Sequence, residues 1–428
     1  MKRISIFFFV FLVLLLNLSE AKQKNKEYVR SKTKTIAIFP FQTKDHISLS
    51  REITKIIAND LSNSGQFNIV FMDQLLKNSN FNSKINLFKH FKIDMFLTGK
   101  IQSDKKHKNF IHYELFSIVD SNKKNIIKNI INITDKIRYD AHTISDEIFK
   151  KITNIPGLFR TKIAYVVKRN DKENLYELRI SDYDGFNKTT IAKLSNPLMS
   201  PAWSPDGQKI VYVMFEKNRS VLVMKNLLNG LTKKITNFKQ HNGSPSFSPD
   251  GRKLAFVLSK SGTLNIYVLD LINGKINQIT NSKKNNTEPS WMPDNKTIVY
   301  TSDQEGYPQI YKINIYGGMS KRITNNGYQN QNAVISSSGA FMVMVSIHSG
   351  QQHITKQNLV TNSVEYLTDT FLDETPSIAP NDTMIIYSCS SKENLNNILR
   401  LVSVDGCFNM RFPEYDGQVK FPAWSPLL

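Results

Sequence analysis

Residues 201–207 read PAWSPDG and are followed by the apolar run KIVYV at 209–213. The same pattern returns 44 residues later as PSFSPDG at 245–251, and after a further 44 residues as PSWMPDN at 289–295. Weaker copies start at Ala333 and Pro376, and a shortened copy occupies 422–426. A repeat period in the low forties, with strand and turn signals in each copy, is typical of a β-propeller whose blades hold four strands each.

The Ser-Pro-Asp-Gly segment predicts a type I turn. Proline fixes the backbone angle at the second position, aspartate tolerates the third, and glycine relieves crowding at the fourth. In the second copy, a hairpin signal at Asn273 and Gly274 separates two further strand-like runs, so each repeat predicts four antiparallel strands. The aspartates Asp206, Asp250 and Asp294 could also form an acidic functional cluster, but the turn explains them fully.

The number of repeats predicts the number of blades. Second-strand signatures start at Ile163, Ile210, Leu254, Ile298, Met342 and Ile385. First-strand signatures start at Pro201, Pro245, Pro289, Ala333, Pro376 and Pro422. The first repeat therefore lacks a first strand, and 422–428 are a first strand with nothing after it. We expect residues 156–428 to form an all-β six-bladed propeller in which the C-terminal strand completes the first blade.

The first 21 residues predict a secretory signal peptide. Lys2 and Arg3 precede a short apolar run at 4–16, and small residues at 19–21 predict cleavage near Ala21. A membrane anchor is the alternative interpretation, but the run is shorter than the roughly 20 residues that span a bilayer, so we expect no membrane-spanning segment. Residues 22–34 are rich in lysine and lack periodicity, which predicts a flexible arm.

Residues 35–155 predict a separate α/β domain. Strand-like runs such as 35–39 and 67–71 alternate with helical patterns near 49–61 and 141–152, and Pro156 and Gly157 mark a linker. The first helical pattern places its apolar residues on one stripe: Leu49, Ile53, Ile56, Ile57 and Leu61. A small mixed sheet with helices on one side is the natural packing of these elements.

The formal net charge of +20 raises the question of an anionic partner. Lysine, asparagine and isoleucine are frequent along the whole chain, which indicates a compositional bias rather than a binding patch, and no nucleic-acid-binding motif accompanies the charge. We therefore expect no nucleic-acid partner. Two cysteines, Cys389 and Cys407, could pair in an oxidising compartment, although two unpaired thiols are the simpler interpretation.

Signals for catalysis are weak. The chain has no nucleophile elbow, phosphate-binding glycine loop or dinucleotide fingerprint. His348 and His353 lie five residues apart across a turn, which favours a loop role over a zinc site. We expect no catalytic residues, cofactor or metal. An enzyme that acts on a saccharide or peptide in the channel stays open as the alternative.

The loops at the other end of the strands are the candidate functional surface. They connect each last strand to the next first strand and are rich in side chains that both donate and accept hydrogen bonds, at 240–244, 285–288, 329–332, 372–375 and 418–421. Loops on a rigid scaffold often carry function, so this ring predicts recognition of a protein or peptide. The alternative is that the loops only hydrate a channel entrance.

Several runs closely resemble the TolB family, the periplasmic components of the Tol-Pal system of Gram-negative bacteria. These runs are NTEPSW at 286–291, TSDQ at 301–304, GQQHI at 350–354, FLDETP at 371–376 and DGQVKFPAWSP at 416–426. The resemblance spans the signal, the α/β domain and all six repeats.

The resemblance implies a periplasmic, non-enzymatic scaffold that binds Pal, the peptidoglycan-associated lipoprotein, over the propeller mouth. The matching positions are His241, Asn242, Ser244, Thr287 and Glu288. It also implies contact between the N-terminal arm and the inner-membrane protein TolA, through a region that includes Lys22, Lys26, Tyr28, Arg30 and Lys34. Such a protein would act indirectly on peptidoglycan and the outer membrane, supporting membrane integrity and invagination during cell division.

Overall fold

The computed structural model describes residues 33–72, 88–103, 109–119, 122–169, 175–217, 219–236, 238–239, 241–392, 396–414 and 416–428. The predicted signal peptide at 1–21 and most of the predicted arm lie outside these residues. The chain divides into two compact units, Met1–Asn154 and Ile155–Leu428.

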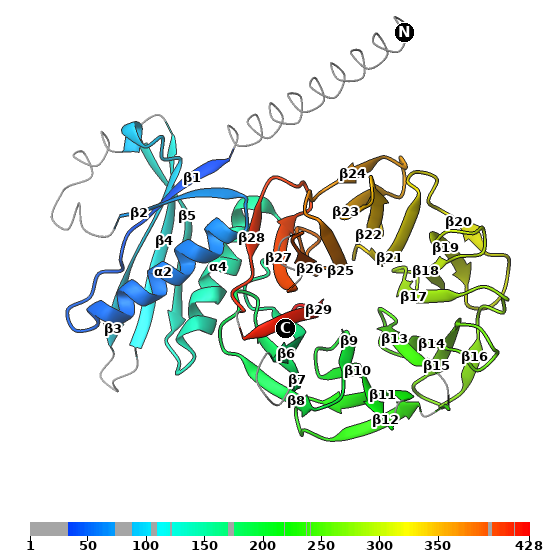
Figure 1. Ribbon diagram of the computed structural model, residues 1–428. Coiled ribbons are helices and arrows are strands. Elements are labelled where there is room, and N and C mark those ends of the chain that lie inside the picture. Colours follow the sequence, from blue (N-terminus) through cyan, green and yellow to red (C-terminus); the bar gives the residue numbers. More distant parts are fainter. Residues whose placement is uncertain are drawn as a thin grey trace, which may run out of the picture. The chain divides into compact units, whose positions relative to one another are not determined.

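The first unit contains a five-stranded mixed sheet in the order β2-β1-β3-β4-β5. Strand β1 is parallel to its neighbours β2 and β3, whereas β3, β4 and β5 are successively antiparallel. The strands are β1 (Lys34–Ile38), β2 (Phe67–Phe71), β3 (Met95–Ser103), β4 (Asn109–Val119) and β5 (Asn122–Asn132). The helices are α2 (Ile47–Asn63) and α4 (Ile137–Thr153). The mixed α/β arrangement agrees with the sequence prediction (Figure 1).

The apolar stripe of α2 explains its packing. Ile53, Ile57 and Leu61 recur at helical spacing and are fully buried, whereas Leu49 is only partly buried. Helix α2 packs against α4, and Tyr113 of β4 hydrogen-bonds Glu147 of α4. These contacts join the helix pair to the sheet.

The regular elements described in the second unit are strands, grouped into sheets that lie around a common centre (Figure 1). The first two sheets use β6 (Lys162–Arg169), β7 (Tyr176–Asp182), β8 (Thr189–Leu194), β9 (Leu198–Trp203), β10 (Lys209–Glu216), β11 (Arg219–Asn226) and β12 (Thr232–Thr236). The next two use β13 (Asn242–Phe247), β14 (Lys253–Leu258), β15 (Asn265–Asp270), β16 (Ile276–Gln278), β17 (Asn286–Trp291), β18 (Thr297–Ser302), β19 (Gln309–Asn314) and β20 (Lys321–Arg322). The remainder are β21 (Gln329–Ile335), β22 (Phe341–His348), β23 (Gln351–Asn358), β24 (Val364–Tyr366), β25 (Leu372–Ile378), β26 (Met384–Ser390), β27 (Ile398–Ser403), β28 (Asn409–Arg411) and β29 (Gly417–Trp424).

Strand pairing follows the sequence repeat. Strands β9–β12, β13–β16 and β17–β20 each form a four-stranded antiparallel sheet. Strands β21–β28 form a longer sheet whose two halves meet at a single bridge between Gln352 and Leu372. The remaining sheet has the order β29-β6-β7-β8, so the last strand of the chain pairs with the first strand of the unit.

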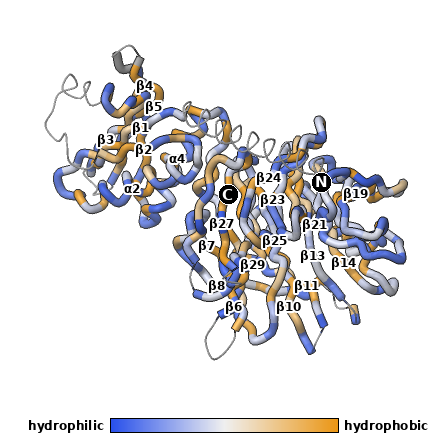
Figure 2. The backbone as a smooth tube through the Cα atoms, turned by 45° about the horizontal axis from the view of Figure 1, so that its top comes forward, coloured by the Kyte–Doolittle hydropathy of each residue, from blue (hydrophilic) through white to orange (hydrophobic). Residues whose placement is uncertain are grey.

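The second strand of each sheet, such as β14, shows almost no alternation of polar and apolar residues because both of its faces are buried. Figure 2 shows that the strands are more apolar than the turns. In β14, Leu254 and Phe256 pack with residues of β10 and β11, whereas Ala255 and Val257 pack with residues of β18 and β19. Each sheet is thus covered on both faces by its neighbours.

The Ser-Pro-Asp-Gly segment forms the predicted turn. Gly207 adopts a φ of +68° and donates its backbone N–H to Ser204 O at 2.9 Å. Asp206 accepts hydrogen bonds from the Ser204 hydroxyl and the backbone N–H of Gln208. Asp250 accepts the equivalent two bonds, and Asp294, which has Met292 in place of the serine, accepts from the backbone N–H groups of Lys296 and Thr297. These aspartates therefore stabilise turns.

The tryptophan in the repeat links neighbouring sheets. Trp203 Nε1 donates to Ala423 O at 3.0 Å, and Trp291 Nε1 donates to Ser246 O at 3.0 Å. Each indole thereby binds the first strand of the preceding sheet through a group that would otherwise be a buried, unsatisfied donor.

Candidate functional site: a channel mouth lined by bulged strands

Six strands line the centre of the ring: β9, β13, β17, β21, β25 and β29, here called the inner strands. Each shifts register once against its partner, which marks a β-bulge. At each shift a non-glycine residue has a left-handed φ between +47° and +54°: Ser200, Ser244, Glu288, Asn332, Thr375 and Phe421. The same strained conformation therefore recurs at one level around the channel.

The residue that follows each bulge explains its position. Five of the six are prolines, Pro201, Pro245, Pro289, Pro376 and Pro422, and the sixth is Ala333. Proline has no backbone N–H and cannot take part fully in a central ladder, so strands accommodate it at bulges. The bulge shifts the register by one residue at the position before the proline.

The inner strands enclose a cavity of about 580 Å³. Among the described residues that line it, Glu288 and Asp382 are acidic and none is lysine or arginine. The six bulge residues all belong to this lining. The wall is otherwise made of small polar, proline and apolar side chains.

Glu288 links two neighbouring inner strands. Its Oε2 accepts hydrogen bonds from Thr301 Oγ1 and from the backbone N–H of Asn332, both at 2.7 Å. Burial raises the pKa of the Glu288 carboxyl, although these two hydrogen bonds act in the opposite direction. Asp382, at the turn end of the strands, accepts from the backbone N–H groups of Ser337 and Ser338. Both carboxylates are therefore engaged in holding adjacent strands.

His241 lies just before β13 with an exposed side chain. Its backbone N–H donates to Ser259 Oγ at 3.0 Å. The imidazole lies over Gly243, where an added Cβ would come within 2.5 Å of His241 Nε2. Desolvation lowers the pKa of His241 below its usual value, which favours the neutral ring. Gly243 thus gives the imidazole its place at the mouth.

Thr287 occupies the position equivalent to Gly243, 44 residues later and one residue before the bulge of β17. It is partly buried and pairs in register with Thr301. Ser244 is the bulge residue of β13 and is also partly buried. Ser244, Thr287 and Glu288 therefore lie near the start of the adjacent inner strands β13 and β17, and His241 lies just before β13. Of these four residues, Ser244 and Glu288 line the cavity.

Asn242 has a structural role. It is fully buried, its backbone N–H donates to Ser220 Oγ, and its side-chain amide donates to Ser220 O and Phe238 O. The equivalent residues make equivalent contacts, from Asn286 to Asn265 and from Asn330 to Gln309. Each of these amides fastens an inner strand to the preceding sheet. The 44-residue spacing of the three asparagines is a sequence signal for this role that our sequence analysis missed.

The boundary between loop and strand differs from the expectation. Inner strands begin at Asn242, Asn286, Gln329, Leu372 and Gly417, so they include most of the residues that the sequence assigned to connecting loops. The reason is that the bulge and the buried amide let a polar segment enter the ladder.

Asp373 takes the asparagine position in β25. It is fully buried, and its carboxylate accepts hydrogen bonds from the hydroxyls of Thr368 and Thr370. Burial raises the pKa of Asp373 to about 6. The next residue, Glu374, forms an ion pair with Lys420 of β29 at 3.1 Å. The mouth thus contains one inter-strand ion pair beside a carboxyl that titrates near neutral pH.

The remaining predicted residues lie elsewhere. Lys34 is the exposed first residue of β1, whereas Lys22, Lys26, Tyr28 and Arg30 lie outside the described residues. Cys389 is buried and Cys407 is partly buried, and burial raises the pKa of the Cys389 thiol to about 12, which keeps it protonated.

The two histidines with the five-residue spacing pack on an aromatic ring. His348 and His353 both contact Tyr366, with ring centroids 5.4 and 6.1 Å apart. This packing accounts for both side chains.

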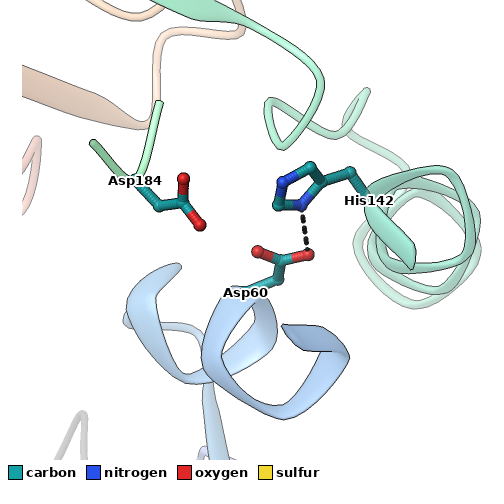
Figure 3. A group of neighbouring side chains, drawn as sticks. All are labelled: Asp60, His142 and Asp184. Atoms are coloured by element: carbon teal, nitrogen blue, oxygen red, sulfur yellow. Dashed lines mark hydrogen bonds and ion pairs between the residues drawn. The ribbon is translucent and has the colours of Figure 1, made fainter. Parts of the chain in front are cut away.

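The first unit holds one buried ionisable pair between its helices. His142 Nδ1 of α4 lies 2.8 Å from Asp60 Oδ2 of α2, and both side chains are almost fully buried (Figure 3). This contact links the two helices. It also gives each of the two buried polar groups a partner, without which its burial would cost free energy. Among the residues described, no helix has the length and apolar character needed to cross a membrane.

Two family profiles match the chain. The TolB amino-terminal domain matches residues 28–124, and the TolB beta propeller domain matches residues 149–428. Individual proteins match over nearly the whole length. The chain is 54% identical over 399 residues to the Tol-Pal system protein TolB of Hamiltonella defensa, and 55% identical over 398 residues to that of Sodalis glossinidius. Each alignment covers 92% of this chain and 92% of the relative.

A solved structure agrees with these relatives. The crystal structure of TolB from Acinetobacter baumannii superposes with a TM-score of 0.82 at 33% sequence identity, and the match covers 92% of this chain and 97% of that one. An amino-terminal domain followed by a β-propeller domain is therefore shared with these proteins, and the chain belongs to the TolB family of Tol-Pal system proteins.

Proposed function

We propose that this protein is an exported, periplasmic and non-enzymatic scaffold that captures the lipoprotein Pal at the channel mouth. The observation that carries the proposal is the grouping of His241, Ser244, Thr287 and Glu288 at one end of two adjacent inner strands, in a chain of the TolB family. The two acidic residues of the cavity lie at opposite ends of the inner strands and are already hydrogen-bonded. This arrangement favours recognition over catalysis in the channel.

The mouth is rigid because the ring is closed. We propose six blades, with β29 as the inner strand of the blade that contains β6, β7 and β8. The pairing of β29 with β6 and the bond from Trp203 to Ala423 O support this closure. A closed ring has no unpaired sheet edge and holds its inner loops at fixed spacing.

The five site residues divide into two roles. His241 and Thr287 present side chains at the mouth and are the candidate contacts with Pal, with Ser244 beside them. Asn242 and Glu288 position these residues, since their polar groups bind Ser220, Thr301 and Asn332 within the propeller. A rigid set of anchors reduces the entropy lost on binding.

The test is the affinity of purified Pal for His241→Ala and Thr287→Ala variants, measured by isothermal titration calorimetry. Loss of a central anchor typically costs about 2 kcal/mol, or roughly 30-fold in Kd. Arg252→Ala is the matched control because Arg252 is exposed at the opposite end of the strands, and we expect its affinity to be unchanged. Normal affinity in both mouth variants would overturn the assigned surface.

Asn242→Ala separates positioning from contact. Removal of this buried amide leaves partners in the preceding sheet unsatisfied, so we expect both thermal stability and Pal affinity to fall. In His241→Ala, by contrast, we expect affinity to fall while stability is unchanged. Equal stability of the two variants would contradict the structural role of Asn242.

We further propose that the N-terminal arm, from Lys22 to Lys34, contacts TolA. Lys34 is the exposed first residue of β1, so a segment that precedes it starts from the surface of the first unit. Deletion of residues 22–32 should abolish TolA binding and leave the capture of Pal at the mouth intact. Through these two partners the protein would act indirectly on peptidoglycan and support outer-membrane integrity and invagination at division. TolA binding by the shortened chain would refute the role of the arm.

A further inference from the structure

Four consecutive outer hairpins expose an apolar residue at the same repeat position. The residues are Leu228, Ile272, Tyr316 and Val360, each 44 residues from the next, here called the rim residues. Their exposed fractions lie between 73% and 82%. Single exposed apolar residues are ordinary on protein surfaces. The recurrence of four at one position of the fold calls for an explanation.

The hairpin geometry holds each rim residue in place. Leu228 donates its backbone N–H to Asn226 Oδ1, and Ile272 donates to Asp270 Oδ1. Tyr316 and Val360 make the same bond to the residue two positions before them, at 2.9 Å in each case. These Asx turns fix the backbone of the hairpin. Each hairpin therefore exposes the side chain at this position in the same direction relative to its own sheet.

The rim residues lie at one level. They occupy the hairpins β11–β12, β15–β16, β19–β20 and β23–β24, whose last strands lie at the perimeter of the ring (Figure 1). Because successive sheets are related by rotation about the channel, equivalent hairpins lie in one plane at right angles to it. In a four-stranded antiparallel sheet these hairpins are at the same end as the Ser-Pro-Asp-Gly turns. They are therefore at the opposite end from His241 and Thr287.

The hairpin tips combine the apolar residues with positive charge. Exposed lysines follow three of them, at Lys233, Lys275 and Lys321. The equivalent tips, at 226–233, 270–277, 314–321 and 358–365, contain two acidic residues: Asp270, which accepts the hydrogen bond of its own turn, and Glu365, which pairs with Lys356. The aspartates of the inner turns lie nearer the channel and accept hydrogen bonds within those turns. Apolar side chains flanked by lysine are the combination that binds anionic lipid interfaces.

The spacing of the rim residues favours a bilayer over a protein partner. Each rim residue lies on its own sheet, so the four are separate side chains rather than the contiguous patch that protein interfaces require. A lipid surface is flat and takes up separate side chains independently. We infer that the outer rim of the propeller docks on the surface of an anionic lipid bilayer, with the rim residues inserted at the headgroup level. This inference goes beyond the proposed capture of Pal, which uses the other end of the strands.

The test is cosedimentation of the chain from Lys22 onward with vesicles of phosphatidylcholine and phosphatidylglycerol. We expect binding, and a Leu228→Ser/Ile272→Ser double variant should lower the partition coefficient by about tenfold, because two large apolar side chains no longer leave water. The matched control is Tyr307→Ser/Tyr328→Ser, which removes two exposed rings at the opposite end of the strands and should bind as the parent does.

Depth and charge are tested separately. Trp203, Trp291 and Trp424 are buried, so Tyr316→Trp introduces an exposed indole whose fluorescence brominated lipids should quench on binding. The triple substitution Lys233→Glu/Lys275→Glu/Lys321→Glu should weaken binding to anionic vesicles, and vesicles of pure phosphatidylcholine should bind the parent more weakly than anionic ones.

Three results would overturn the inference. The first is absence of vesicle binding, or equal binding by the rim double variant. The second is binding that disappears when residues 22–32 are deleted and does not depend on the rim, which would assign it to the basic arm. The third is rim-dependent self-association in analytical ultracentrifugation without vesicle binding, which would assign the rim to a second copy of the chain. Pal binding is unaffected in all three cases, so failure here leaves the proposed function standing.

Discussion

Substitution of Arg179 by methionine should strongly destabilise the propeller. The guanidinium is almost fully buried and contacts three carboxylates, with Glu177 at 2.7 Å, Asp416 at 2.6 Å and Glu414 at 3.2 Å. The Glu414 side chain is completely buried and is also bound by Tyr165 and Lys188. These contacts join β7 to the segment that leads into β29. Arg179 therefore fastens the part of the ring where the two ends of the unit meet.

The expected magnitude follows from the charge left behind. Methionine fills much of the same volume, but Glu177 and Glu414 lose their strongest partner while staying buried. Loss of one member of a buried ion pair typically costs 3–5 kcal/mol. Because Tyr165 and Lys188 still bind Glu414, we expect a loss of about 3 kcal/mol, which corresponds to a fall in Tm of roughly 5 °C for a domain of this size.

The assay is chemical denaturation followed by circular dichroism, together with hydrogen exchange of β29. Arg322→Met is the matched control because the Arg322 and Glu305 side chains are 31% and 53% exposed, so loss of their ion pair should cost less than about 1 kcal/mol. We expect Arg179→Met, and not the control, to increase exchange of β29 and β6. The double variant Arg179→Met/Glu414→Gln should recover part of the lost stability. A loss in Arg179→Met no larger than that in Arg322→Met would refute the reasoning.

Two further predictions follow from the inner strands. Folding raises the pKa of Asp373 to about 6, so the folded state binds the proton of this carboxyl more tightly and stability falls as the pH rises from about 4 to 6. Asp373→Asn should therefore stabilise the protein by about 2 kcal/mol at pH 7 and have little effect at pH 4. Thermal melts that show the same difference at both pH values would contradict this prediction. Trp203→Phe removes the hydrogen bond to Ala423 O and leaves a buried carbonyl unsatisfied, which should lower the free energy of unfolding by about 1–2 kcal/mol. Trp291→Phe should lower it by a similar amount. Urea denaturation measures both losses, and no change in either variant would contradict the linking role of the indoles.

The features that sequence reasoning predicted well are those set by local spacing. The stripe in α2 predicted a helix at 49–61, and the structure has Ile47–Asn63; the strand predicted at 67–71 is β2. The turn at Ser204 follows from the conformational limits of four consecutive residues. In these cases the physics acts within a few residues, so the pattern is visible in one copy and reinforced by repetition.

The features that it missed depend on distant partners. Proline after Ser244 or Glu288 does not by itself reveal a left-handed bulge, because the bulge arises from pairing with the next strand. Asn242 looked like a loop donor because its partner, Ser220, lies in the preceding sheet. Similarly, Arg179 and Glu414 are more than two hundred residues apart in the chain. The contacts of each such residue depend on how distant strands are arranged in the fold, and a short stretch of sequence does not show that arrangement.

The pairing of β29 with β6 has a consequence for the order of folding. Trp424 pairs with Ile163, so the sheet that comes first in the unit needs the last residues of the chain before it is complete. The sheets β9–β12, β13–β16 and β17–β20 can each form from contiguous sequence, whereas β6 keeps an open edge until the end. Contacts of such long sequence separation slow folding, and an open strand edge invites pairing with other chains. Pairing of β29 with β6 therefore covers a strand edge that would otherwise stay open to pairing with other chains.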